Sequence, residues 1–158
     1  MAEGIHAENA PKAVGSYPHA RRVGPWLLLS GIGPRSASDD SIPGSVLDQH
    51  GNLLAYDIEA QCHSVFANVK AVLAASGADL VDLVDVTVYL TDMAADFKTY
   101  NRIWAEYFPN PANAPCRHDR AGPRSARQRQ APMGRACAVE APTPRARRPQ
   151  SPISSVRS

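Results

Sequence analysis

The amino-acid composition changes at Arg117, and this change limits where the chain can build a folded core. The first 117 of the 158 residues carry 8 Lys and Arg against 13 Asp and Glu, a net charge of −5. The other 41 carry nine Arg, no Lys and two acidic residues, a net charge of +7. They also hold six Pro but no Leu, Phe, Trp or Tyr. Because such a segment has little apolar surface to bury, the core must come from the residues before it.

Residues 118–158 show neither the two-residue apolar repeat of a strand nor the 3.6-residue repeat of a helix. We therefore expect a folded domain over residues 1–117 and a disordered tail over residues 118–158. A basic arm for nucleic acid is disfavoured, because the tail lacks Lys and any aromatic side chain for base stacking. Out-of-frame translation of a GC-rich gene explains the composition of the tail better, because it yields Arg, Ala, Pro and Gly at high frequency. One inserted cytosine turns codons for Arg-Thr-Thr into codons for Arg-His-Asp, the residues at 117–119.

Length and apolar pattern restrict the class of protein. A chain of 158 residues has room for one domain. No apolar run approaches the ~20 residues that cross a bilayer, so no membrane partner is expected, and the first residues lack the features of a secretion signal. Cys62, Cys116 and Cys137 are odd in number and form no CxxC motif. Reduced thiols and a cytoplasmic location are therefore expected.

The first half of the folded part predicts a strand pair, a loop and a helix. The apolar run at 25–31 predicts a strand, and residues 17–23 can pair with it through a tight turn. Residues 33–56 are rich in Gly, Pro, Ser and Asp and predict a long loop with room for a small hairpin at 48–51. Asp57 can cap a helix that Gly77 ends. Its apolar stripe is Ile58, Cys62, Val65, Phe66, Val69 and Leu73.

The second half predicts a strand and another helix. Residues 84–90 alternate, with Val84, Val86, Val88 and Leu90 on one face. Thr91 and Asp92 can cap a helix that ends at Pro109 and Pro111. Its apolar stripe is Phe97, Tyr100, Trp104 and Phe108. The order β-β-α-β-α predicts an α+β two-layer sandwich with both helices on one face of the sheet. A further strand starts at 114–117 but is not continued by the composition that follows.

Most familiar catalytic and metal motifs are missing from the sequence. The five His never fall at i, i+4 spacing, so no metal site is expected. There is no nucleophile elbow and no Walker loop, and Gly31-Ile32-Gly33 lacks the third glycine of a dinucleotide fingerprint. Polar residues remain at the ends of apolar elements, namely Tyr17, Ser30, Asn101 and Arg117. Taken singly, each has an ordinary structural explanation as a turn, cap or surface residue.

Five stretches in a fixed order carry a more specific signal, at 9–19, 28–34, 68–77, 85–93 and 114–117. Together they resemble the reactive-intermediate deaminase family (Rid, also called YjgF/UK114), over about residues 6–117. Further cues at 31–35, 42–44, 56–62 and 96–108 are similar to the members that act on 2-aminomuconate. The resemblance implies a chorismate-mutase-like fold, a mixed sheet backed by two helices. It also implies a homotrimer whose ligand clefts lie between neighbouring subunits.

The resemblance implies a reaction as well. Rid enzymes hydrolyse enamines and imines to a carbonyl compound and ammonia, without metal or organic cofactor. Arg117 matches the arginine that grips the substrate carboxylate. Ser30 and Tyr17 match cleft positions that bind the substrate or place the water, and Asn101 matches a polar helix residue of that cleft. A dicarboxylate such as 2-aminomuconate needs a second cation, for which Arg35 is the candidate.

The sequence departs from the family after Arg117. Members continue with a strand, a Leu-Pro turn and a last strand whose acidic residue commonly helps to hold the catalytic water, and none of these is recognisable here. We therefore expect the last two strands to be missing, and activity and assembly to be impaired. The alternatives to a 2-aminomuconate deaminase are a broad-specificity 2-imino acid deaminase and a non-catalytic trimer that binds small ligands.

Overall fold

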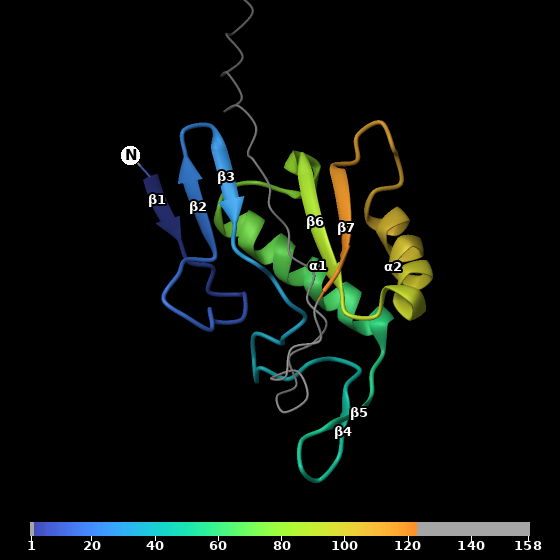
Figure 1. The fold of residues 1–158 in the computed structure, drawn as a ribbon. Helices are drawn as coiled ribbons and strands as arrows, with labels where there is room; N and C mark the ends of the chain where they lie inside the picture. The colour runs from blue at the N-terminus through green and yellow to red at the C-terminus, as the bar shows by residue number, and fades with distance from the viewer. Residues whose placement is uncertain (1, 123–158) are drawn as a thin grey trace, which may run out of the picture.

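The computed structural model describes residues 2–122 and has two helices and two separate groups of strands beside a small hairpin (Figure 1). Of the expected tail, residues 118–122 belong to the described part and residues 123–158 lie outside it. Within that part, α1 runs behind β3 and β6, and α2 packs next to it (Figure 1). The predicted α+β class is confirmed. No helix among residues 2–122 is long and apolar enough to span a membrane.

The first sheet has the antiparallel order β1-β2-β3, with β1 at Ala2–Ile5, β2 at Ala20–Val23 and β3 at Trp26–Leu29. The predicted pairing of β2 with β3 is confirmed. Gly24 has a φ of 58° in the connecting turn, a left-handed conformation that glycine adopts without steric cost. The strand β1 was not predicted, because its four residues are too few to show an apolar alternation.

The small hairpin in the long loop is also present. It consists of β4 (Val46–Leu47) and β5 (Leu53–Ala55). Asp48 shapes its turn by accepting hydrogen bonds from the backbone amides of His50 and Asn52 and from the Asn52 side chain, each at 2.8 Å. These bonds, with that from the Asn52 side chain first, lower the pKa of the Asp48 carboxyl. A carboxylate turn of this kind explains why so short a hairpin forms.

Helix α1 spans Ile58–Ala75 between the predicted signals. The Asp57 carboxylate accepts hydrogen bonds from the amides of Glu59 and Ala60, at 2.9 and 3.2 Å. Gly77, at φ 72°, follows the helix, as predicted. The predicted stripe is confirmed apart from Ile58, which is only half-buried. The residues buried along α1 are Gln61, Cys62, Val65, Phe66, Asn68, Val69, Val72 and Leu73.

A short 3-10 turn, η1 (Leu80–Asp82), leads into β6, which spans Asp85–Leu90. Val86, Val88 and Leu90 are buried, whereas Val84 precedes the strand and is 47% exposed. Helix α2 spans Met93–Tyr107, and Asp92 caps it.

One member of the predicted stripe on α2 is placed differently. Phe97 is 38% exposed, and Ile103 is fully buried in the core instead. The guanidinium of Arg117 lies 5.9 Å from the centre of the Phe97 ring, so this ring packs at the edge of the core.

The prediction that the strand after α2 stops at Arg117 is wrong. Strand β7 spans Cys116–Ala121 and runs parallel to β6, with Arg117 beside Val86 and Ala121 beside Leu90. Strand pairing uses backbone groups, so a polar sequence can continue a ladder at a sheet edge. The first of the two strands expected to be missing is therefore present. The second would fall in residues outside the described part.

Candidate active site

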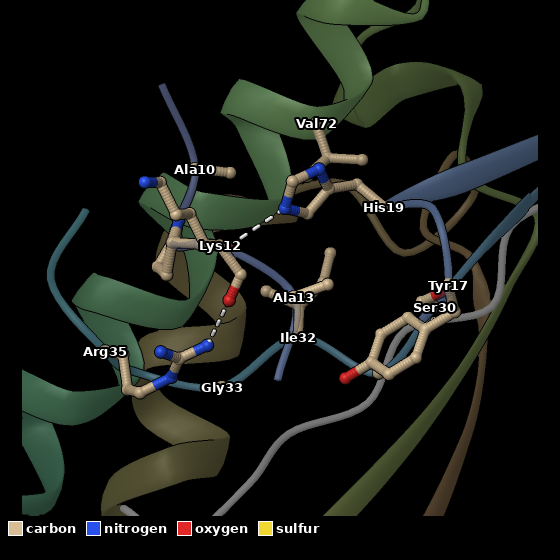
Figure 2. A pocket seen from close by; sticks show the side chains of 12 residues that line it. Ala10, Lys12, Ala13, Tyr17, His19, Ser30, Ile32, Gly33, Arg35 and Val72 are labelled. Carbon is tan, nitrogen blue, oxygen red and sulfur yellow. Dashed lines mark hydrogen bonds between the residues drawn. The ribbon is translucent and has the colours of Figure 1, made fainter. Parts of the chain in front are cut away.

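A pocket lies between the first sheet and the N-terminal end of the long loop. The space in and in front of it that no protein atom fills is about 390 Å³, open solvent included. Three of the predicted site residues, Tyr17, Ser30 and Arg35, line it together. Figure 2 shows Arg35 and Tyr17 on opposite sides of this space. The other lining residues are Ala10, Pro11, Lys12, Ala13, His19, Gly31, Ile32, Gly33 and Val72.

Ser30 directly follows β3 and is fixed by two bonds to the loop before β2. Its hydroxyl donates to the Pro18 carbonyl at 2.6 Å, and its amide donates to the His19 carbonyl at 2.9 Å. Since the hydroxyl proton is used, Ser30 Oγ faces a ligand as an acceptor. Tyr17 is 40% exposed at the pocket wall. The pair can therefore accept from a protonated nitrogen or a water and, through the Tyr17 hydroxyl, donate to an oxygen.

His19 holds the N-terminal wall of the pocket. Its Nδ1 accepts from the Ala7 amide and its Nε2 donates to the Pro11 carbonyl, both at 2.9 Å. An acceptor Nδ1 and a donor Nε2 define one neutral tautomer, so neither nitrogen is left for proton transfer. His19 is a positioning residue. It could not be recognised in the sequence, because its partners are main-chain groups that no side-chain pattern reveals.

Two polar residues of α1 hold the loop segment that follows Gly31. Asn68, only 7% exposed, donates to the carbonyls of Gly33 and Arg35 at 2.9 and 2.8 Å. Ser64 donates to the Pro34 carbonyl at 2.8 Å. The segment that carries Arg35 is therefore tied to α1. Asn68 was overlooked in the sequence, where a polar residue inside an apolar helical stripe is the signal that could have identified it.

Arg35 reaches the pocket from that tied segment. Its Nη2 donates to the Lys12 carbonyl at 2.6 Å (Figure 2). Its Nη1 pairs with Asp40 Oδ1 at 2.7 Å. The guanidinium thus links both sides of the pocket rim. A fixed arginine at a pocket wall is suited to bind a carboxylate.

Arg117 and Asn101 lie elsewhere, on β7 and α2. Arg117 Nη2 donates to Asn101 Oδ1 at 2.9 Å, and Nε donates to Asp119 Oδ2 at 3.1 Å. The guanidinium also lies over Tyr100 and Trp104, 5.3 and 5.0 Å from the ring centres. Neither Arg117 nor Asn101 lines the pocket of Tyr17 and Ser30. One chain therefore presents the five predicted residues as two separate groups.

The buried cysteine of the described part is poorly suited to catalysis. Burial and the nearby Asp96 carboxylate raise the pKa of the Cys62 thiol to about 12, so this cysteine stays protonated in the core, as predicted from the apolar stripe. Between residues 2 and 122, no group of three or more His, Cys, Asp or Glu side chains is placed to hold a metal ion. The polar side chains that line the pocket are those of Lys12, Tyr17, His19, Ser30 and Arg35.

Comparison with known proteins identifies the family. The family model described as endoribonuclease L-PSP matches residues 7–121, most of the chain and nearly all of its described part. The chain belongs to the Rid family. Among its relatives is the chloroplastic reactive intermediate deaminase A of Arabidopsis thaliana, 35% identical over 112 residues, 71% of this chain and 54% of the plant protein.

A second relative and a solved structure extend the comparison. The 2-iminobutanoate/2-iminopropanoate deaminase of Salmonella typhimurium is 32% identical over 108 residues, 68% of this chain and 74% of that protein. The crystal structure of E. coli TdcF with bound serine has a TM-score of 0.69 and 25% identity, covering 91% of this chain and 99% of TdcF. The match of the family model through Ala121 agrees with β7 being part of the Rid domain.

Proposed function

We propose that this Rid protein hydrolyses enamine or imine carboxylates, with 2-aminomuconate as its substrate. The observation that carries the proposal is the meeting of Tyr17, Ser30 and the cation Arg35 on one pocket. Two relatives named for deamination support the reaction type. Arg35 supports a substrate with a second carboxylate, because it offers a guanidinium at the pocket wall.

The reaction needs a clamped substrate and a placed water. An enamine first takes a proton from water at carbon and becomes a protonated imine. The oxygen of a water then bonds to the imine carbon, and one of its protons passes to nitrogen. The C–N bond breaks as the C=O bond forms, ammonia leaves, and the second water proton is released to solvent. Ser30 Oγ, as an acceptor, suits a protonated imine nitrogen or the water, and the Tyr17 hydroxyl suits the other partner. These groups position the reactants, so the reaction asks for no strong acid or base from the protein.

Arg117 takes part in this proposal through assembly. Because it lies apart from the pocket within one chain, we propose that a homotrimer brings Arg117 and Asn101 of one subunit to the pocket of the next. Large apolar side chains on the strands support an assembly of this kind. Trp26 and Leu28 of β3 are 51% and 47% exposed, and Tyr89 of β6 is 36% exposed. Arg117 would then grip the carboxylate beside the imine.

Two further functions each have an observation in their favour. The relative named 2-iminobutanoate/2-iminopropanoate deaminase favours a broad-specificity 2-imino acid deaminase. TdcF, solved with bound serine, favours a trimer that binds small ligands without turnover. The family description names an endoribonuclease, so RNA is included in the test below.

The test is an ammonia-release assay of the full chain with 2-aminomuconate and with 2-iminobutanoate, beside an RNA-cleavage assay. Faster release from 2-aminomuconate, reduced in Ser30→Ala, supports the proposal. Equal or faster release from 2-iminobutanoate selects the broad-specificity enzyme, and ligand binding without ammonia release selects the binding protein. RNA cleavage alone would overturn all three. The mass in solution tests the trimer, and a monomer that releases ammonia would refute the shared site.

A further inference from the structure

The ion pair of Arg35 joins a fixed cation to an anion on an exposed turn. Arg35 is held from behind, because its carbonyl accepts from the buried Asn68 on α1. Its side chain is 23% exposed, whereas that of Asp40 is 66% exposed. The turn is closed by short backbone bonds between Ser36 and Ser41, at 2.7 Å, and between Asp40 and Ser36, at 3.1 Å. The position of Arg35 is therefore fixed by contacts within the protein, whereas the Asp40 carboxylate that pairs with it lies in solvent.

Asp40 adopts an unusual backbone conformation in this turn. Its φ of 59° makes it the one non-glycine residue with positive φ within residues 2–122. This left-handed region is disfavoured for residues with a Cβ, although Asp and Asn tolerate it better than others. Its side chain ends at Arg35 Nη1, 2.7 Å away.

An exposed ion pair of this kind is easily exchanged. Solvent screens the attraction, and the side chains lose freedom to form it, so such pairs contribute little to stability. The second contact of Arg35, from Nη2 to the Lys12 carbonyl, does not depend on Asp40. A ligand carboxylate that enters the pocket can therefore replace Asp40 at Nη1 while the guanidinium stays in place.

We propose that Asp40 is a specificity-determining counter-ion, which occupies Arg35 until the distal carboxylate of a dicarboxylate ligand displaces it. The inference rests on the proposed function and deepens it, since it explains how the pocket selects a ligand with two carboxylates. A monocarboxylate bound near Ser30 leaves the Arg35–Asp40 pair intact. A dicarboxylate breaks that pair and gains a charge-assisted contact in exchange.

The test uses two ligands that differ at one end. trans,trans-Muconate is an unsaturated dicarboxylate, and sorbate has the same carbon chain with a methyl group in place of one carboxylate. Their affinities for the full chain are measured by isothermal titration calorimetry. Asp40→Asn removes the competing charge and tolerates the positive φ. It is expected to tighten muconate binding about two- to fivefold, the strength of an exposed ion pair, and to leave sorbate unchanged.

Matched variants distinguish the displacement of Asp40 from Arg35 from a general effect of net charge on ligand affinity. Asp39→Asn removes the same charge one residue away, at a side chain that accepts from Ser41 and not from Arg35. It should leave both affinities unchanged. Asp40→Gly removes the charge and the backbone strain together, and it should reproduce the Asp40→Asn result. Arg35→Gln should abolish the preference for muconate over sorbate.

A selective gain for muconate in both Asp40 variants supports the inference. Equal gains for both ligands, a gain in Asp39→Asn, or a wild-type chain that binds neither ligand would overturn it. The ammonia-release assay is independent of this result. If no substrate is deaminated but the selective gain is found, the proposed function fails while the role of Asp40 stands. If 2-aminomuconate is deaminated but muconate binds wild type and Asp40→Asn equally well, the proposed function stands and the role of Asp40 fails.

Discussion

Arg117 of β7 donates a hydrogen bond from Nη2 to Oδ1 of Asn101 on α2, with 2.9 Å between the two atoms. The same guanidinium pairs with Asp119 and lies 5.0 Å from the centre of the Trp104 ring. Because its side chain is only 19% exposed, these contacts also connect the last described strand to the second helix. Arg117 therefore has a structural task in each chain besides the carboxylate contact that we propose for it.

Replacing Arg117 should lower the efficiency of catalysis. Arg117→Ala is expected to lower kcat/KM of ammonia release about 10- to 100-fold, the loss of a hydrogen bond to a charged group. Arg117→Lys should recover only part of this, since an ammonium lacks the bidentate fork. Steady-state kinetics with 2-aminomuconate give the comparison.

The matched control for this prediction is Arg102→Ala. Arg102 is an exposed arginine that pairs with Glu59 and Glu106 on the helices. Its loss should leave kcat/KM within about twofold, because exposed pairs contribute little. Equal losses of activity in the Arg102 and Arg117 variants would contradict a carboxylate contact at Arg117.

Asn68 should be more important for stability than its place on a helix suggests. Asn68→Ala removes both donors from the carbonyls of Gly33 and Arg35. Leaving two part-buried carbonyls unpaired should lower the free energy of unfolding by about 2–4 kcal/mol. Urea unfolding followed by circular dichroism measures it. Asn52→Ala, in the exposed hairpin, is the control and should cost under about 1.5 kcal/mol. An equal loss of unfolding free energy in the two variants would mean that the hydrogen bonds of Asn68 stabilise the fold no more than an exposed hydrogen bond does.

Gly44 is predicted to be intolerant of any side chain. It has a φ of 72°, and a Cβ added there would lie 2.5 Å from Cβ of Asp57, the residue that caps α1. Gly44→Ala should therefore cost about 2–5 kcal/mol, from backbone strain and displacement of the cap together. Gly51 has a similar φ of 79° but open space around it, so Gly51→Ala should cost only about 1–2 kcal/mol. Thermal or urea unfolding of the two variants gives the difference in their free energies of unfolding, which measures the clash with Asp57. Equal losses in the two variants would show that there is no such clash.

The helices and β6 could be predicted because each has a strong local signal. Asp57 and Asp92 are caps, and the apolar repeats that follow them have the helical period. The alternation of Val86, Val88 and Leu90 predicted β6 for the same reason. Strand β7 was predicted too short because its local signal is weak. All six of its residues are polar or small, and its pairing with β6 depends on backbone groups that composition does not report.

The residues of the site differ in the same way. Tyr17, Ser30 and Arg35 could be chosen from motifs, and the structure places them on one pocket. His19 and Asp40 could not be chosen, since their roles arise from main-chain partners and from a turn that brings residues together only after folding. The catalytic roles of all five sequence-derived residues stay predictions, of which the Ser30 and Arg117 variants above test two by kinetics and the Arg35 variant tests one by binding.

The two described cysteines should differ sharply in reactivity. Both are free thiols, with Cys62 buried and Cys116 exposed on β7. Burial, with the negative charge of Asp96 adding to it, raises the pKa of Cys62 to about 12, so below that pH its native thiol stays protonated and unreactive. In the unfolded chain a thiol ionises above about pH 8.5. The contribution of the protonated Cys62 thiol to the free energy of unfolding is therefore fully present below that pH, and it is lost as the pH rises towards 12.

Alkylation with iodoacetamide at pH 8.5, followed by peptide mapping, measures this difference directly. The native chain should be labelled at Cys116 and protected at Cys62, and both should react in guanidinium chloride. Raising the pH of the native sample to 10 should leave Cys62 protected for as long as the fold persists, which circular dichroism of the same sample monitors. Rapid labelling of Cys62 in a chain that retains its native spectrum would show that α1 does not pack against the core as described.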